Sequence, residues 1–410
     1  MPASPAKLPR ASLLALCLAL LATATVQAQQ NEKHAPIVVS EQARQIQAEA
    51  ILIDGHNDLP WKIRERGSPA FDKLDIAKPQ AGLHTDIPRL RAGGVKAQFW
   101  SVYVPSSTRH TGRALADTLE QIELVKAMIA HYPQTFEFAG TVADIRRIVA
   151  AGKIASLIGV EGGHSIENSL NVLRQLYVEG ARYMTLTHSD TLDWADSATD
   201  EERHGGLTPF GEEVVHEMNR LGMLVDISHV SIGTMKQALA ISQAPVIFSH
   251  SSARAIANHP RNVPDEVLRL VPQNGGVVMV NFYPGFVVPS SAERLSSAIP
   301  QFREFRKQHA GDAEAIRKEM RRWSMENPLE HGDIEIVLDH IDHIVEVAGI
   351  DNVGLGSDFD GIEIVPRQLE DVSAYPRITQ GLLDRGYSTE EIKKILGENL
   401  LRAMEKAEKV

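Results

Sequence analysis

Short runs of apolar and β-branched residues recur along the chain, and polar or turn-forming residues separate them. Runs of this kind are typical of strands that are buried on both faces. Eight runs fit the description: 50–54, 95–104, 155–160, 181–187, 222–227, 245–248, 276–282 and 353–356. The pattern therefore predicts eight core strands.

The stretches between these runs carry apolar residues at helical spacing. In 114–131 the apolar residues recur three and four positions apart, which places them on one face of a helix. The stretch 208–221 opens with Thr208 as a candidate N-cap, followed by Pro209 at the first helical position. Further helices are predicted over 334–347, 368–385 and 389–406.

The alternation of strands and helices predicts an α/β fold with a parallel sheet. Eight buried strands favour a closed (β/α)8 barrel of the TIM type, with the last two helices as C-terminal additions. A doubly wound open sheet is the alternative. The 410 residues, 43% of them hydrophobic, suffice for one barrel domain of about 250 residues with additions.

One stretch, 284–328, interrupts the alternation between the seventh run and the helix that follows it. It carries several basic residues, among them Arg303, Arg306 and Arg317, between acids and apolar residues. We expect a helical insertion here. It is either a solvated excursion or a lid or subunit contact, because insertions that follow barrel strands lie at the catalytic face.

The first 28 residues form a pattern of their own. Lys7 and Arg10 precede an apolar run that is too short to span a bilayer, and residues 26–28 suit signal peptidase. We therefore expect a signal peptide that is cut after Ala28. The remaining domain, 29–410, would be exported to the periplasm or secreted, without a stable membrane anchor.

The net charge of −11 makes nucleic acid an unexpected partner, because nucleic-acid binding needs a basic surface.

Residues with metal-binding side chains follow several predicted strands, at the point where each strand ends. His56 and Asp58 follow the first run, and residues two apart in an extended chain point to the same side. Glu161 follows the third run, and its two carboxylate oxygens could bridge two cations. In a barrel the carboxyl ends of the strands meet at one mouth.

Three histidines and a further acid extend this set. His188, His229 and His250 end the fourth, fifth and sixth runs, and Asp358 follows the eighth. A lone residue of this kind is more often structural, but so many at strand ends predict a metal site. Imidazole and carboxylate ligands suit zinc, and they also suit manganese, cobalt or iron.

The segments that contain these residues resemble the membrane dipeptidase family, metallopeptidase family M19. The resemblance spans about residues 45–405, and the motifs stand in the order in which the family has them. The matching segments are 54–61, 161–163, 183–188, 227–229, 248–251, 261–265, 279–283 and 357–361. The resemblance implies a barrel of the metal-dependent hydrolase (amidohydrolase) type that cleaves dipeptides.

The resemblance also implies a centre with two zinc ions. His56 and Asp58 would bind the first ion, and His229 and His250 the second. Glu161 would bridge the two. A hydroxide held between the metals would then attack the amide bond.

Further residues would handle the substrate, by the same resemblance. Asp358 would move protons, and His188 would face the substrate carbonyl. Arg261 would hold the C-terminal carboxylate, a role that its forked guanidinium suits. Tyr283 and Trp61 would line the pocket. The expected partners are a dipeptide, including one with a C-terminal D-residue, and a second subunit in a homodimer.

Other functions stay open at this point. The same metals would serve the hydrolysis of a lactone, cyclic amide or phosphotriester, and loss of Arg261 would then matter little. A catalytically silent metal- or peptide-binding protein would not need Asp358. Some members of the family open β-lactam rings, so this side activity is a further hypothesis.

Overall fold

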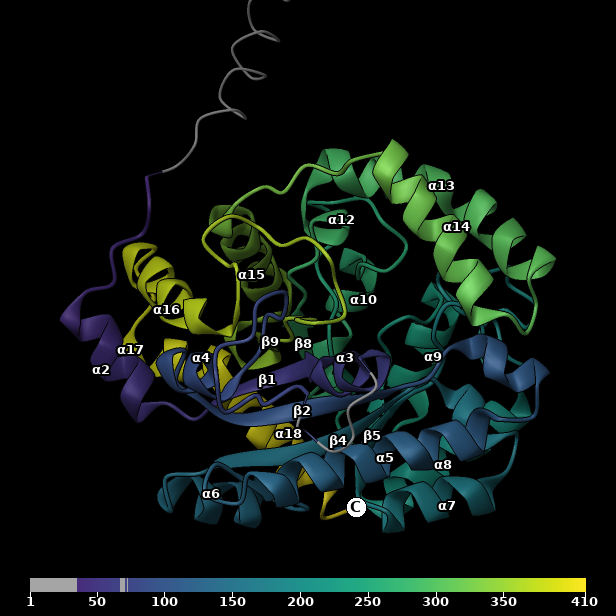
Figure 1. Ribbon diagram of the computed structural model, residues 1–410, viewed down its shortest axis with the longest axis horizontal. Helices are drawn as coiled ribbons and strands as arrows, with labels where there is room; N and C mark the ends of the chain where they lie inside the picture. The colour runs from purple at the N-terminus through teal and green to yellow at the C-terminus, as the bar shows by residue number, and fades with distance from the viewer. Residues whose placement is uncertain (1–34, 67–70, 72) are drawn as a thin grey trace, which may run out of the picture. The chain divides into compact units, whose positions relative to one another are not determined.

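Eight parallel strands close into a barrel in the structure, a computed structural model that describes residues 35–66, 71 and 73–410 (Figure 1). The order around the barrel is β2-β1-β9-β8-β7-β6-β5-β4, and pairing of β2 with β4 closes it. The predicted barrel is confirmed, and the open doubly wound sheet is excluded. The barrel strands are β1 (Leu52–Asn57), β2 (Val95–Tyr103), β4 (Ile154–Glu161), β5 (Ala181–Thr185), β6 (Leu224–Asp226), β7 (Ile247–Phe248), β8 (Val277–Val280) and β9 (Val353–Leu355).

The predicted strands are all present, but their ends differ. The first strand does not stop at Asp54, because Asn57 still pairs with Trp100 of β2. Every residue of β1 and β4 is buried, as expected for strands covered on both faces. The predicted signal peptide over 1–28 lies outside the described residues.

One strand of the sheet, β3 (Phe136–Phe138), was not predicted from the sequence. It pairs with the first part of β4, where Phe136 lies opposite Ile154. The neighbouring strand β5 pairs with β4 only from Ile158 onward, so the start of this edge is available to β3. Only Phe136 of these three residues is buried, and the polar Glu137 interrupts the strand, so no apolar run marks it in the sequence.

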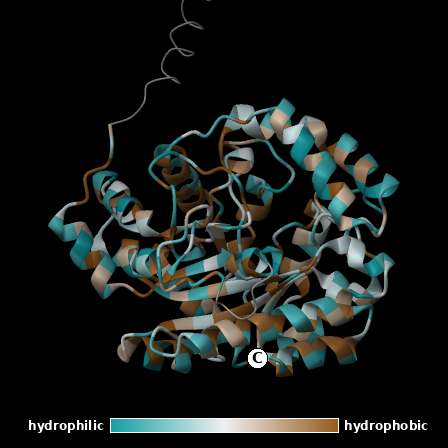
Figure 2. Cartoon of the chain, in the orientation of Figure 1, coloured by the Kyte–Doolittle hydropathy of each residue, from teal (hydrophilic) through white to brown (hydrophobic). Residues whose placement is uncertain are grey.

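Helices cover the outside of the barrel. Helix α5 (Ala114–His131) has the predicted bounds, and the predicted N-cap of α8 (Pro209–Leu221) is confirmed, because the Thr208 side chain accepts the N–H of Gly211. Figure 2 shows hydrophobic residues concentrated on the strands and on the inner sides of these helices. The other helices of this layer are α2 (Glu41–Glu49), α3 (Leu59–Glu65), α4 (Ile87–Ala92), α6 (Val142–Ala150), α7 (Leu170–Val178), α9 (Ile232–Ile241), α10 (Asp265–Leu268), α11 (Val271–Asn274) and α15 (Ile334–Ala348).

The C-terminal helices are shorter than predicted. The helix predicted over 368–385 begins only at Tyr375 (α16, Tyr375–Asp384), because Gln368 has a φ of 73° and Asp371 caps the short turn η4 (Val372–Ala374). The helix predicted over 389–406 is divided into α17 (Thr389–Lys393), a π-helical turn η5 (Lys394–Glu398) and α18 (Asn399–Ala407).

The division falls at Gly397. A Cβ atom at this position would overlap the carbonyl oxygen of Ile51, just before β1. The chain therefore approaches the start of the barrel more closely than a regular helix with side chains could. Leu400, Leu401 and Met404 of α18 join residues of the barrel interior in one apolar cluster.

The stretch 284–328 forms three helices between β8 and α15: α12 (Pro284–Val287), α13 (Pro289–Gln308) and α14 (Ala313–Glu326). In Figure 1, α13 and α14 lie on the opposite side of the strands from α5 and α8. The two long helices share a small apolar cluster of Ala298, Phe305 and Trp323. We call α13 and α14 together the helical hairpin.

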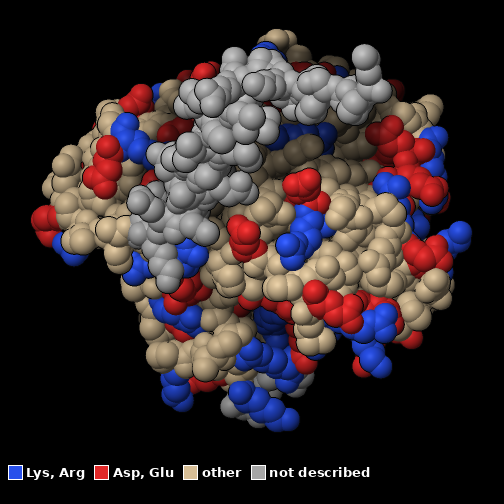
Figure 3. Space-filling model, turned by 90° about the horizontal axis from the view of Figure 1, so that it is seen from above, with Lys and Arg blue, Asp and Glu red and all other residues tan. Residues whose placement is uncertain are grey.

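Acidic and basic side chains lie beside one another on the face seen in Figure 3. Ion pairs also join neighbouring helices, for example Lys236 of α9 and Glu266 of α10 at 2.8 Å. Among the helices of the described residues, none combines the length and apolar character that a membrane span requires.

Candidate active site

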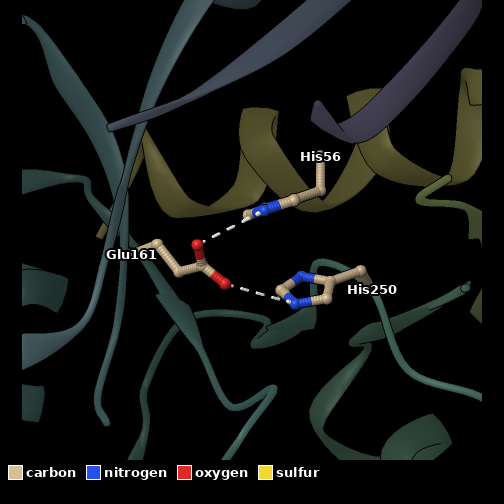
Figure 4. Close-up of side chains that lie close together, drawn as sticks. All are labelled: His56, Glu161 and His250. Atoms are coloured by element: carbon tan, nitrogen blue, oxygen red, sulfur yellow. Dashed lines mark ion pairs between the residues drawn. The ribbon is translucent and has the colours of Figure 1, made fainter. Parts of the chain in front are cut away.

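The carboxyl ends of five barrel strands bring four predicted histidines together around one predicted carboxylate. Glu161 ends β4, and His56 lies in β1; His188, His229 and His250 follow β5, β6 and β7. Figure 4 shows Glu161 between His56 and His250, with one carboxylate oxygen directed at each ring.

Both oxygens of Glu161 face imidazole nitrogens. Its Oε2 lies 3.6 Å from Nε2 of His56. Its Oε1 lies 3.1 Å from Nε2 of His229, 3.5 Å from that of His250 and 3.7 Å from that of His188. Glu161 is therefore the central member of the cluster, with histidines on two sides.

Two aspartates approach the cluster from the β1 side. Asp58 Oδ2 lies 3.2 Å from Nε2 of His56. Backbone hydrogen bonds join the segment that ends β1 to the loop after β9. They run from Asp58 N to Phe359 O at 2.9 Å and from Asp358 N to His56 O at 3.1 Å. Gly361 fits between the two carboxylates, where an added Cβ would overlap an oxygen of both Asp58 and Asp358.

Three overlapping groups of these residues have ligand atoms close enough to share a cation. The groups are His56, Glu161 and His250; Glu161, His188 and His229; and His56, Asp58 and Asp358. Each group has its ligand atoms within 4.8 Å of one another. Neutral imidazoles and carboxylates are the donor set that zinc and similar divalent ions take.

Burial sets the protonation of these histidines. It lowers the pKa of His188, His229 and His250 well below the ordinary value, and the nearby Arg261 adds to the effect. Burial acts in the same direction on His56, but Tyr183, Glu161 and Asp58 together raise its pKa well above the ordinary value. Three of the four rings are thus neutral and can offer a lone pair to a metal.

Hydrogen bonds at the other ring nitrogen orient two of the histidines. Nδ1 of His56 lies 2.9 Å from the hydroxyl of Tyr183, and Nδ1 of His250 lies 2.8 Å from Oγ of Ser249. Ser249 in turn donates to the buried carboxylate of Asp226 at 2.6 Å. Contacts of this kind fix the ring and direct Nε2 toward the cluster.

The sequence analysis did not single out Tyr183 or Asn281, although both lie in quoted motifs. Tyr183 lies within β5, and its ring packs against Gly159 of β4, where a Cβ would overlap it. Asn281 donates to Oδ2 of Asp358 at 2.9 Å. The glycine in the middle of an otherwise apolar strand is the one signal that pointed to a close approach.

The ionisation of Asp358 is strongly altered. Burial, together with the nearby charges of Asp58 and Glu161, raises the pKa of Asp358 to about 7, against the effect of His56. A carboxyl group with this pKa can both accept and release a proton near neutral pH.

A cavity of about 690 Å³ lies over the cluster. Trp61 of α3 and Tyr283 line it, as predicted from the resemblance, and so do Ile316 and Met320 of α14. The helical hairpin therefore forms part of the cavity wall, which excludes a purely solvated excursion.

Arg261 lies beside this cavity rather than in its wall. It lines a smaller adjoining cavity of about 120 Å³. Its Nη1 donates to Oγ of Ser251 at 3.3 Å and its Nη2 to the carbonyl oxygen of His250 at 3.2 Å. Burial lowers the pKa of Arg261 to about 10, although Asp358 and Glu161 act against this, so the guanidinium keeps its charge at neutral pH.

Two further histidines, His164 and His340, contribute hydrogen bonds to the fold. His164 Nε2 pairs with the carbonyl oxygen of Val104 at 3.0 Å. His340 accepts the N–H of Ala253 at 3.0 Å and contacts the carbonyl oxygen of Val287 at 3.0 Å, so it joins α15 to the loop after β7 and to the end of α12.

The family model of membrane dipeptidases, peptidase family M19, matches residues 40–410. The chain belongs to this family. It is therefore a metal-dependent dipeptidase, in agreement with the cluster of histidines and carboxylates at the barrel mouth.

Solved structures similar to this M19 chain have the same fold. The probable dipeptidase PvdM from Pseudomonas aeruginosa is 22% identical, with a TM-score of 0.78 over 90% of this chain and 98% of that one. A metallopeptidase from Rhodobacter sphaeroides, bound to a phosphinate mimic of the dipeptide L-Ala-D-Ala, is 25% identical, with a TM-score of 0.71 over 88% of this chain and 100% of that one.

A third similar structure is that of dipeptidase AC, a metallopeptidase of family M19. It is 24% identical, with a TM-score of 0.72 over 88% of this chain and 99% of that one. Each of the three matches covers 88% or more of this chain.

Proposed function

We propose that this protein is an exported zinc dipeptidase that binds two metal ions and hydrolyses the amide bond of dipeptides. The observation that carries the proposal is the arrangement of histidines around both oxygens of Glu161. A carboxylate that faces nitrogen ligands on two sides is suited to bridging two cations.

The residues present fit such a pair of ions. His56 Nε2 has no hydrogen-bond partner among the described residues and faces the carboxylates of Asp58 and Glu161. His56 and Asp58 would hold one zinc, His229 and His250 the other, and Glu161 both. Bound zinc would polarise the substrate carbonyl and lower the pKa of a water molecule.

The remaining residues would bind the substrate and move protons. His188 lies in the cavity wall, where its Nε2 can donate to the substrate carbonyl oxygen. Asp358 would take a proton from water and deliver it to the leaving amine. Its Oδ2 accepts from Asn281, which leaves Oδ1 for this transfer.

Substrate selection would rest on three further side chains. Arg261 would pair with the C-terminal carboxylate of the dipeptide, because its buried charge needs an anion. Trp61 and Tyr283 would pack against the substrate in the main cavity. The Rhodobacter sphaeroides relative was solved with a mimic of L-Ala-D-Ala, which supports including dipeptides with a C-terminal D-residue.

Export rests on the sequence of the first 28 residues, with cleavage after Ala28. Expression of the full chain in a bacterium tests it. A mature N-terminus at Gln29 in the periplasm or medium is expected, whereas full-length protein retained in the cytoplasm would contradict export.

An assay of the mature protein on L,L and L,D dipeptides, a tripeptide and a neutral lactone tests the activity. We expect loss of dipeptide cleavage with a chelator, recovery with two equivalents of zinc, and no tripeptide cleavage. Cleavage of the lactone alone would replace the proposal with another amidohydrolase reaction. Metal binding without any turnover would indicate a silent binding protein.

A further inference from the structure

The smaller cavity beside Arg261 lies between the loop after β7 and the helical hairpin. It shares His229, Phe286 and Arg306 with the main cavity, so the two adjoin directly on the side of the candidate metal ligands. A dipeptide whose amide carbonyl lies at the metals would direct its C-terminal end into this space.

Two buried hydrogen-bond donors in its wall have no partner in the part of the chain that the structure describes. They are Nε of Arg261 and Nε2 of His259, and both residues are 2% exposed. A buried donor without a partner costs about 1–3 kcal/mol, more if charged. The cavity therefore favours a ligand that accepts hydrogen bonds at its end.

The hydrogen on Nε2 of His259 follows from its other contact. Nδ1 of His259 accepts the backbone N–H of Arg261 at 3.1 Å. Burial, with Arg261 and Arg254, lowers the pKa of His259 to about 3, so the ring is neutral. A neutral imidazole that accepts at Nδ1 carries its hydrogen on Nε2.

Both donors are held in place by the same aromatic ring. The Arg261 guanidinium lies 5.2 Å from the centre of the Phe286 ring, and the His259 ring lies 4.8 Å from it. Asn262 fixes the loop after β7 to helix α12, because its Nδ2 donates to the carbonyl oxygen of Phe286 at 2.6 Å. The donors are thus positioned before any ligand arrives.

The far wall of the cavity is apolar. Leu295, Ile299 and Phe302 of α13 form it. The cavity has a volume of about 120 Å³. This accommodates a carboxylate with a small side chain and leaves no room for another peptide unit.

We propose that His259 is a second ligand for the substrate carboxylate, with Nε2 donating to one oxygen while Arg261 binds the other. The α13 wall closes the cavity behind the carboxylate and so limits the substrate to two residues. This inference rests on the proposed dipeptidase function.

The substitution His259→Asn tests it. Asparagine places an acceptor near the Nδ1 position, which keeps the bond to Arg261 N, and removes the donor at Nε2. We expect KM for a dipeptide to rise about tenfold or more, as for loss of a hydrogen bond to a charged group, with kcat within twofold. Hydrolysis of the corresponding dipeptide amide, which has no carboxylate, should not change.

Binding provides a readout that does not depend on turnover. Calorimetry of zinc-loaded wild type and His259→Asn with a phosphinate dipeptide mimic should show a loss of about tenfold in affinity. Equal affinities of wild type and variant, or an equal loss of activity on the dipeptide and its amide, would overturn the role of His259. Either result would leave the proposed dipeptidase function standing. A wild type that neither binds the mimic nor cleaves dipeptides would remove the proposed function, and this inference with it.

Discussion

The hydroxyl oxygen of Tyr183 lies 2.9 Å from Nδ1 of His56, inside the barrel and behind the candidate metal ligands. The same hydroxyl lies 3.3 Å from the carbonyl oxygen of Gly55. Tyr183 therefore fixes the orientation of the His56 ring from β5, which is separated from β1 around the barrel by β2 and β4.

Replacement of Tyr183 by Phe should weaken metal binding without unfolding the protein. Loss of such an outer contact to a metal-binding histidine typically lowers metal affinity about 10–100-fold. Competition with a chromogenic chelator measures this affinity. Tyr387→Phe is the control, because it removes a hydroxyl bonded to Asp342 at 2.8 Å on a C-terminal segment. Equal affinity of Tyr183→Phe and wild type would contradict the orienting role.

Asp358→Asn should abolish turnover and leave the metals bound. The amide cannot accept and deliver a proton as the carboxyl group does, and rate losses of about 10²–10⁴-fold are typical for a missing general acid or base. Steady-state kinetics and metal analysis of the same sample check this. Asp351→Asn, at a residue that pairs with Lys394 at 2.7 Å on the surface, should behave as wild type. Turnover by Asp358→Asn near the wild-type rate would exclude the proton role.

Gly361→Ala should impair activity more than stability. The added methyl group would overlap oxygens of both Asp58 and Asp358, so at least one carboxylate must move. We expect kcat/KM to fall by about 10²-fold, since displacements of about 1 Å have such effects. Gly112→Ala is the control, because no described atom lies within 4 Å of its Cβ position, and its φ of 66°, unlike that of Gly361, adds backbone strain to the control only. Similar kinetics for the two variants would argue against the steric explanation.

Arg306→Ala should loosen the helical hairpin. Arg306 Nε pairs with Asp190 at 2.7 Å in a largely buried position, and its Nη2 donates to Thr199 O at 3.2 Å. Loss of this pair should lower the free energy that holds the hairpin in place by about 2 kcal/mol, less than for a fully buried pair. Protease cleavage at the turn 309–312 between α13 and α14 should become several-fold faster, with a raised KM.

Arg322→Ala is the matched control for this experiment, since Arg322 pairs within α14 with Glu319. Unchanged cleavage and KM in Arg306→Ala would show that other contacts hold the hairpin.

The strand ends could be predicted because apolar periodicity stops where a polar side chain begins, as at His229 after β6. The residues that orient the side chains at these strand ends could not be predicted. Tyr183 lies within an apolar strand and reaches His56 only because β4 contributes Gly159 beside it, a juxtaposition of three strands distant in sequence. The late start of α16 depends similarly on a local hydrogen bond, which Ser373 N donates to the Asp371 carboxylate at 2.8 Å.

The position of Arg261 illustrates the same limit. The motif around it predicts a carboxylate ligand, but the sequence does not reveal that the residue lies in a separate small cavity closed by α13. The donor on His259 also depends on the fold, because its tautomer follows from one backbone contact.

Ala298, Phe305 and Trp323 pack on one another, with Leu295, Phe302 and Met320 around them, in a cluster distinct from the main core. The hairpin thus has an apolar centre of its own. Substitutions there can accumulate while the barrel and its metal ligands stay unchanged. Residues 289–326 are therefore a self-contained unit that can be exchanged for another helical segment without changing the metal ligands.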